Sequence, residues 1–152
     1  MPHGKDADMR NVVLNQMPKV EAAYNDDALM AKWEKIHALR DDVNRALEAA
    51  RAAHEIGKSL EAKVTLYADG EDLAVIRGIN ESLASLFIVS KVEVCEGSGD
   101  GVKAENFENL SIAIAKASGT KCPRCWIFSE NAGENPDHPE LCPRCSAVVS
   151  NM

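Results

Sequence analysis

Two pairs of closely spaced cysteines constrain this chain more than any other feature. They follow the pattern C-x2-C-x16-C-x2-C, and their members are Cys122, Cys125, Cys142 and Cys145. A two-residue spacing lets one sharp turn aim two thiolates at the same ion, and the longer spacer lets a second turn supply the other pair. Four thiolates complete the tetrahedral coordination of zinc and leave no position for a reactive water. The pattern therefore predicts one structural Zn²⁺ with these four cysteines as its ligands.

The alternative for the four cysteines is two disulfide bonds, which would suit a small secreted domain. The sequence contains neither a basic-then-apolar leader nor an apolar run of membrane-spanning length. We therefore expect a cytoplasmic protein with no membrane partner, whose thiols stay reduced. The fifth cysteine, Cys95, lies in an apolar run far from both pairs, where a buried and inert thiol is expected.

Residues 26–56 have the pattern of one long amphipathic helix. Its apolar positions share one face and are Leu29, Trp33, Ile36, Leu39, Val43, Leu47 and Ala50. Residues 25–27 supply capping oxygens and negative charge, Gly57 follows the last turn, and His54 is expected on the apolar face. Asp42 and the other charged residues of both signs predict a solvated face. The apolar face must pack against the rest of the chain, a second copy or helices outside the chain.

Residues 60–119 predict a small layer of strands and helix. The expected elements are a strand at 60–67, a helix at 71–86 weakened by Gly78, and strands at 87–95 and 110–117. A flexible glycine-rich loop is expected at 97–101, but it lacks the context of a dinucleotide-binding fingerprint. The predicted fold class is therefore α+β, with a long amphipathic helix, a small α/β layer and a four-cysteine zinc knuckle.

The charge of the chain bears on which nucleic acid it could bind. The formal net charge is −7, and residues 126–141 carry four acidic side chains and no lysine or arginine. A DNA-binding finger gains its affinity largely from phosphate neutralisation, so we expect no DNA partner.

Arg124 lies inside the first cysteine pair and Trp126 follows it. An indole beside a guanidinium can stack on an unpaired base of an RNA loop. The alternative is that Trp126 packs over the zinc site and Arg124 hydrogen-bonds to nearby carbonyl groups.

Several runs of residues resemble one known family, the bacterial-type isoleucyl-tRNA synthetases of class I. The run KCPRCW at 121–126, followed by HPELCPRC at 138–145, is similar to the family's carboxy-terminal zinc motif. The runs AKWEKI at 31–36 and VNRALEAAR at 43–51 resemble the last long helix of its anticodon-binding bundle. The run IGKSLEAKV at 56–64 resembles the beginning of its junction domain.

The resemblance extends from about residue 12 to residue 152 and implies a fragment of a much longer enzyme. It implies three domains, namely the end of a helical anticodon-binding domain at 1–57, an α+β junction domain at 58–119 and a zinc-binding domain at 120–152. The parent would attach isoleucine to tRNA with ATP, and ATP would bind only in its missing catalytic domain. The fragment, which lacks the ATP-binding signatures, is expected to be inactive and to have no catalytic residues.

The resemblance also implies the partners of the fragment. They would be the anticodon arm of tRNA(Ile) and the remaining domains of the parent synthetase, which is expected to be a monomer. Arg124 and Trp126 match positions that the family uses at the anticodon end, so the resemblance implies that they contact RNA.

Two other functions remain open at this point. A DNA-repair glycosylase of the formamidopyrimidine type has a similar four-cysteine finger and an amino-terminal proline, as in Met1-Pro2 of this chain. However, His3 stands where its glutamate should follow, and the finger lacks the arginine that would enter DNA. The other candidate is a structural zinc module for protein assembly, with Trp126 and the apolar helix face as the interface.

Overall fold

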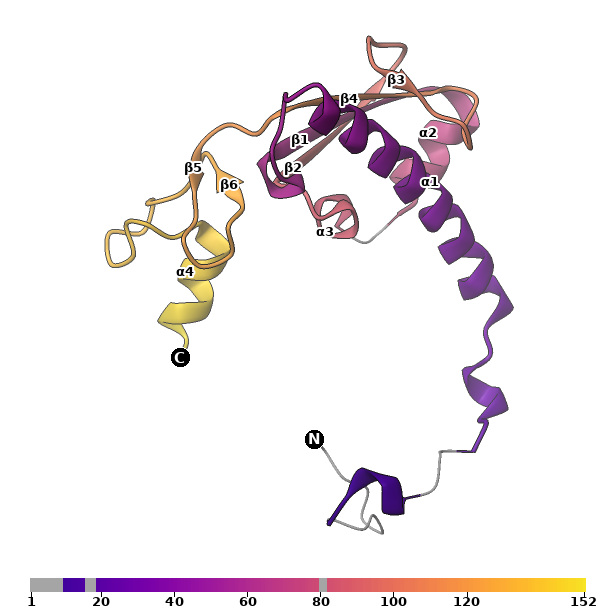
Figure 1. Cartoon of the computed structure of the whole chain (residues 1–152), viewed down its shortest axis with the longest axis horizontal. Coiled ribbons are helices and arrows are strands. Elements are labelled where there is room, and N and C mark those ends of the chain that lie inside the picture. The colour runs from indigo at the N-terminus through magenta and orange to yellow at the C-terminus, as the bar shows by residue number, and fades with distance from the viewer. Residues whose placement is uncertain (1–9, 16–18, 80–81) are drawn as a thin grey trace. The chain divides into compact units, whose positions relative to one another are not determined.

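The computed structural model describes residues 10–15, 19–79 and 82–152 (Figure 1). The chain divides into two units after Lys32. The first unit contains two short 3-10 helices, η1 (Val12–Leu14) and η2 (Ala22–Tyr24). Within its described residues, apolar side chains such as those of Val20 and Tyr24 are exposed rather than packed into a core. Residues 1–3, which were compared with a DNA glycosylase, lie outside the described part of the chain.

Helix α1 (Asp27–Ala52) begins where the sequence predicts. The carboxylate of Asp26 accepts a hydrogen bond from the backbone N–H of Leu29 at 2.9 Å, as an N-cap does. Most of the predicted apolar face is buried, and the buried members are Ile36, Leu39, Val43, Leu47 and Ala50. Leu29 is exposed and Trp33 is partly exposed, so the amino-terminal end of the apolar face is not covered to the same degree.

The carboxyl end of α1 comes four residues earlier than predicted, at Ala52 rather than residue 56. His54 adopts a left-handed backbone with φ of 59°, and its N–H donates to the carbonyl of Arg51. The N–H of Glu55 donates to the carbonyl of Ala50, which completes the hydrogen bonds of a Schellman helix end. His54 is exposed beyond the helix, so its expected place on the apolar face is wrong.

A four-stranded sheet with the order β2-β1-β4-β3 forms the centre of the second unit. The strands are β1 (Ala62–Ala68), β2 (Lys91–Glu96), β3 (Val102–Lys103) and β4 (Leu110–Lys116). Strand β2 runs parallel to β1 and β4 runs antiparallel to it, with Leu66 opposite Val94 and Ile112. The parallel pair requires a crossover, which helices α2 (Gly70–Arg77) and α3 (Leu83–Phe87) provide.

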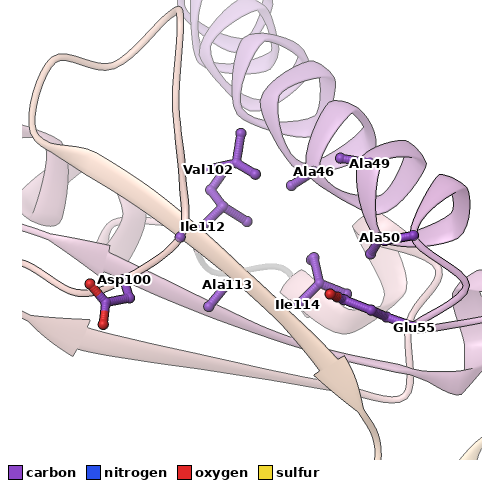
Figure 2. A pocket seen from close by; sticks show the side chains of 11 residues that line it. Ala46, Ala49, Ala50, Glu55, Asp100, Val102, Ile112, Ala113 and Ile114 are labelled. Atoms are coloured by element: carbon purple, nitrogen blue, oxygen red, sulfur yellow. The ribbon is translucent and has the colours of Figure 1, made fainter.

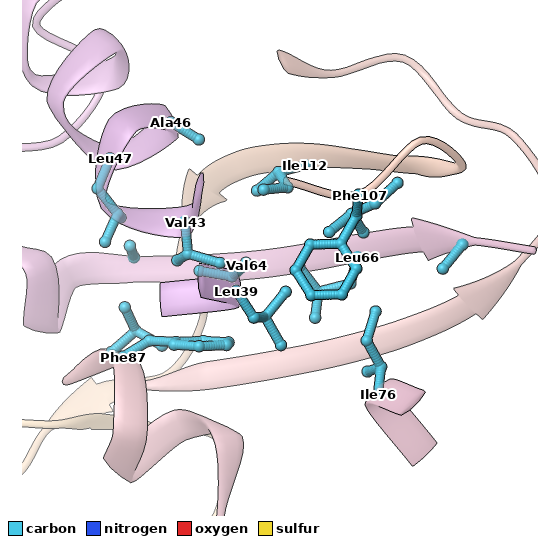
Figure 3. Close-up of a cluster of buried hydrophobic side chains, with 14 of the residues drawn as sticks. Leu39, Val43, Ala46, Leu47, Val64, Leu66, Ile76, Phe87, Phe107 and Ile112 are labelled. Carbon is cyan, nitrogen blue, oxygen red and sulfur yellow. The ribbon is translucent and has the colours of Figure 1, made fainter. Parts of the chain in front are cut away.

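The core lies on one face of this sheet, where α1 packs against it (Figure 3). Alternate residues of β1 are fully buried, and their side chains meet the apolar face of α1. Helices α2 and α3 close the same core with Ile76 and Phe87, and Phe107 enters from the loop before β4. The predicted α+β fold class is confirmed. None of the described helices is long and apolar enough to cross a membrane.

The predicted helix at 71–86 is wrong in its continuity, because the chain leaves the helix at Gly78 and starts α3 at Leu83. Ile88 then takes a left-handed backbone with φ of 58°, which delays β2 until Lys91 rather than residue 87. Leu60 lies in the 3-10 helix η3 (Ser59–Glu61) instead of the first strand. Cys95 lies on β2 and is partly exposed, so the expectation of a fully buried thiol is wrong.

A buried carboxylate on α1 holds the loop that precedes β4. Asp42 is 1% exposed and accepts hydrogen bonds from the backbone N–H groups of Glu105 and Asn106, both at 3.0 Å. The side-chain amide of Asn106 donates to the same carboxylate, and Arg45 forms an ion pair with it. The expectation that Asp42 lies on a solvated face is therefore wrong, because the charge pattern cannot reveal a loop that returns to the helix.

Replacing this carboxylate should destabilise the fold measurably. Asp42→Ala is expected to lower the free energy of unfolding by about 2 kcal/mol, because two loop N–H groups and Arg45 lose their partner. Urea denaturation measures this change. Asp41→Ala is the matched control because its side chain is exposed on the same turn, and it should change stability by less than about 0.5 kcal/mol. Equal effects of the two variants would show that the loop contacts contribute little.

Candidate metal centre and RNA-contact residues

The first cysteine pair lies in a tight turn at the end of a short two-stranded ribbon. Strands β5 (Thr120–Lys121) and β6 (Phe128–Ser129) pair in antiparallel fashion around it. The N–H of Cys122 donates to the carbonyl of Ile127 at 2.9 Å, and the N–H of Trp126 donates to the carbonyl of Cys122 at 2.8 Å. These two bonds close the turn that carries both cysteines.

The second cysteine pair lies at the start of helix α4 (Pro143–Ser150), an element that the sequence analysis did not predict. Cys142 is the N-cap residue and Pro143 occupies the first turn, where its missing N–H costs nothing. Cys145 follows in the first turn, and Ser146 donates its N–H to the carbonyl of Cys142 at 2.9 Å. The amino end of a helix favours negative charge, so this position suits thiolates.

The four sulfurs of the two pairs converge on one point. Their sulfur atoms all lie within 4.8 Å of one another, and three of the four residues are buried. A tetrahedral zinc ion with Zn–S bonds of about 2.3 Å places its sulfurs about 3.8 Å apart, so the cluster fits this ion. All five cysteines are free, and the sulfurs of Cys125 and Cys142 are 3.6 Å apart, too far for a disulfide bond. Cys95 is not a member of the cluster.

The environment of the cluster makes the four thiols unequal as acids. Burial raises the pKa of the Cys125 thiol to about 12, and contacts with the neighbouring thiols add to this effect. Burial also opposes ionisation of Cys122, but backbone N–H groups of Cys142, Cys125 and Arg124 lower its pKa to about 6. Zinc coordinates only thiolates, so binding must release the protons that remain. Metal binding is therefore expected to weaken as the pH falls.

Arg124 and Trp126 extend from the first turn in different ways. The Nη1 atom of Arg124 donates to the sulfur of Cys145 at 3.7 Å, and this contact opposes the effect of burial and lowers the pKa of that thiol. The guanidinium thus contacts a sulfur rather than the carbonyl groups considered above. Trp126 is 62% exposed and adopts a left-handed backbone with φ of 68°. The indole therefore does not pack over the cluster as a buried cover.

The long spacer between the cysteine pairs is held to α4 by a partly buried hydrogen bond. The side-chain amide of Asn135 donates to the hydroxyl of Ser146 at 2.7 Å, and Ser146 is 3% exposed. The N–H of Gly133 donates to the carbonyl of Leu141 at 3.0 Å and narrows the loop. We call residues 120–152 the zinc module. Its buried core consists of Cys122, Cys142 and Cys145, against which Cys125, Ile127 and Leu141 pack.

A second hydroxyl connects the zinc module to the sheet. The Oγ atom of Ser90 donates a hydrogen bond to the carbonyl of Leu60 at 2.5 Å. It accepts a hydrogen bond from the backbone N–H of Phe128 at 2.7 Å. Lys91 and Ser118 both contact Glu130, which adds polar contacts between the two parts. The sequence analysis did not single out Ser90, because a single serine within the strand predicted at 87–95 carries no recognisable pattern.

A pocket of 470 Å³ lies away from the cysteines, between α1 and the β3–β4 edge of the sheet (Figure 2). Its lining is mostly small and apolar, with Ala46, Ala49 and Ala50 on the helix side. The titratable groups in this lining are Glu55 and Asp100, which Figure 2 shows at separate ends of the pocket. This lining contains no nucleophile next to a base, so it does not resemble a catalytic site.

A comparison with protein families identifies the zinc module. Residues 119–148 match the family described as "Zinc finger found in FPG and IleRS". This match and the convergent sulfurs agree on one structural zinc, so that prediction is confirmed. The disulfide alternative is not what the structure contains.

Curated relatives match nearly the whole chain. The isoleucine–tRNA ligase of Desulforamulus reducens is 44% identical over 144 residues, which cover 93% of this chain and 15% of the relative. The ligase of Bacillus mycoides is 40% identical over 97% of this chain and 16% of its own length. That of Geobacillus thermodenitrificans is 39% identical over 99% and 16%. The chain thus spans about one sixth of the length of these relatives, and it belongs to the isoleucine–tRNA ligase family as a segment that carries a zinc finger.

Proposed function

We propose that this chain is the carboxy-terminal part of an isoleucine–tRNA ligase and that it binds the anticodon arm of tRNA(Ile). In this proposal the parent joins isoleucine to its tRNA with ATP in the cytoplasm, as a monomer. ATP binds only in the parent's catalytic domain, and the segment has no catalytic residue of its own. Residues 1–57 end the helical anticodon-binding domain, residues 58–119 form the junction domain, and residues 120–152 bind zinc.

Within the zinc module, the proposed ligands are Cys122, Cys125, Cys142 and Cys145. The metal supplies no chemistry in this role, because four thiolates occupy every position of a tetrahedral ion. Its effect is to fix the turn that carries Arg124 and Trp126. The proposed RNA-contact residues are these two side chains.

The observation that carries the proposal is the exposure of Trp126. Its indole is 62% exposed although the backbone beneath it is held by two hydrogen bonds and has a left-handed φ of 68°. A left-handed conformation costs a non-glycine residue roughly 1 kcal/mol or more, so stability alone would favour glycine at this position. A rigid, exposed aromatic ring beside a guanidinium suits stacking on an unpaired RNA base.

A protein interface is the second candidate for the same surface, since an exposed indole also serves in protein–protein contacts. The positions of Lys58 and Lys121 near Trp126 favour RNA, because ammonium groups pair with phosphates. The acidic net charge of the chain implies that most phosphate contacts of the parent come from other parts of it.

Indole fluorescence tests the proposed contact directly. In a Trp33→Phe background, Trp126 is the remaining tryptophan, and titration with an RNA hairpin of the tRNA(Ile) anticodon arm should quench its emission. An RNA hairpin with the same stem and abasic loop positions is the matched control and should quench less. Equal quenching by the two hairpins would contradict base stacking and would favour the protein-interface candidate.

A further inference from the structure

A groove of 310 Å³ lies directly beside the exposed indole. Its lining comes from the η3 turn on one side and the zinc module on the other, namely Lys58, Leu60, Glu61, Lys121, Trp126 and Phe128. The volume is at the lower limit of small-molecule sites, which span about 300–1,000 Å³. The groove therefore has room for one small planar group and not for a folded element.

The two walls of the groove are tied to each other. The Ser90 hydroxyl donates to the carbonyl of Leu60 in one wall and accepts the N–H of Phe128 in the other. The backbone N–H of Ala117, which follows β4, donates to the carbonyl of Glu61 at 2.7 Å and holds the η3 wall to the sheet. These contacts set the width of the groove before any ligand arrives, which reduces the entropy lost on binding.

The groove is locally cationic although the chain as a whole is acidic. Lys58 and Lys121 are both exposed at its lining, and the single carboxylate there belongs to Glu61. That carboxylate accepts the N–H groups of Gly57 at 2.9 Å and Lys58 at 3.4 Å. These backbone hydrogen bonds lower the pKa of Glu61. Glu61 thus stabilises the turn that presents Lys58, because its Oε2 atom accepts both of these hydrogen bonds.

Sites for single-stranded nucleic acid combine aromatic side chains, on which bases stack, with basic groups that follow the backbone. This groove contains both, because Trp126 and Phe128 lie in it together with two ammonium groups. We propose that the groove binds one unpaired nucleotide of RNA, with its base stacked on Trp126 and its flanking phosphates held by Lys58 and Lys121. This inference rests on the proposed RNA-binding function and adds residues from the η3 turn to the site.

A binding experiment with the zinc-loaded full chain tests the groove. The probe is the RNA hairpin of the tRNA(Ile) anticodon arm, and the measured quantities are its affinity and the slope of log affinity against log salt. The double variant Lys58→Ala/Lys121→Ala should bind about tenfold more weakly. Its slope should decrease in magnitude by about 1.4, since each phosphate contact to a single strand contributes about 0.7.

The matched control is Arg77→Ala/Lys103→Ala, which removes the same charge from exposed positions on α2 and β3 in the junction domain. It should leave the slope nearly unchanged. Ser90→Ala removes the hydroxyl that connects Leu60 and Phe128 in the two walls of the groove. It should weaken RNA binding without changing the salt slope, because it removes no charge. Zinc content and thermal unfolding of each variant report whether the zinc module remains folded.

The outcomes separate this inference from the proposed function. If Trp126→Asn abolishes binding while the groove variant matches the Arg77→Ala/Lys103→Ala control in affinity and slope, the two lysines of the groove do not contribute and RNA binding by Trp126 stands. If the unmodified chain does not bind the hairpin at low salt, both proposals are overturned. Binding of the groove variant with lowered affinity and a reduced slope, at wild-type zinc content, supports the groove.

Discussion

Removal of zinc will unfold the zinc module and leave the helix–sheet core intact. The module has few apolar side chains besides its cysteines in its buried cluster, so metal binding must supply most of its folding free energy. Structural zinc in small fingers contributes about 10–16 kcal/mol, which is comparable to the whole stability of an ordinary domain. The core on the sheet has its own buried residues from α1 and β1 and does not depend on the ion.

Hydrogen exchange of the full chain can measure this result residue by residue. After chelation, the N–H groups of Cys122, Trp126 and Ser146 should lose their protection, because their hydrogen bonds exist only within the folded module. The amides of β1 should keep theirs. Cys122→Ser should reproduce the effect of the chelator.

Cys95→Ser is the matched control for loss of a thiol, since Cys95 is outside the sulfur cluster. It should retain one zinc per chain and normal protection of the zinc module. Metal analysis that finds no zinc in freshly reduced wild-type protein would contradict the site. Simultaneous loss of protection in β1 would contradict the independence of the core.

Loss of the two proposed RNA-contact side chains should impair aminoacylation but not amino-acid activation. In the full-length synthetase that carries this segment, Arg124→Ala/Trp126→Asn should lower kcat/KM for tRNA charging by about 10- to 100-fold. This range follows from a stacking free energy of about 1–3 kcal/mol per base. Asparagine is chosen because it tolerates the left-handed backbone that Trp126 adopts. Isoleucine-dependent pyrophosphate exchange should remain within about twofold, because the proposed function assigns this chemistry to another domain of the parent.

Matched substitutions within the zinc module control for nonspecific damage. Arg144→Ala removes an exposed arginine from the second cysteine pair, and Val148→Asn removes an exposed apolar side chain from α4. Both should charge tRNA at nearly the wild-type rate. Because Arg124 and Arg144 both contact the Cys145 sulfur, the zinc content of the double variant and of Arg144→Ala must be measured. Equal loss in charging and exchange would indicate a folding defect instead of a lost RNA contact.

Elements with a clear hydrophobic period were predictable from the sequence. Alternate burial along β1 and the first half of β4, and the apolar face of α1, follow directly from their patterns. Helix ends were less predictable, because the left-handed residues at which helices α1 and α3 end are His54 and Ile88 rather than glycine. A histidine and an isoleucine give no signal for this conformation, whose cause is the packing around them.

The metal centre was more predictable than its surroundings. Cysteine spacing is a local pattern that favours one metal site over two disulfide bonds, so the convergence of the four sulfurs could be predicted from it. Asp42 and Ser90 contact loops and strands far away in the sequence, and no local pattern encodes such contacts. Lys58 and Lys121 are likewise ordinary surface lysines in the sequence, and only the fold brings them to one groove.

The most direct test of the whole account is the affinity of this chain for the tRNA(Ile) anticodon arm at one fixed salt concentration, before and after chelation. The account predicts that the zinc-loaded chain binds this arm more tightly than the arm of a tRNA for another amino acid. It also predicts that chelation abolishes the difference, because the turn that carries Trp126 is then unfolded. An affinity that is unchanged by chelation, or that is equal for both arms, would contradict the claim that the zinc module reads RNA.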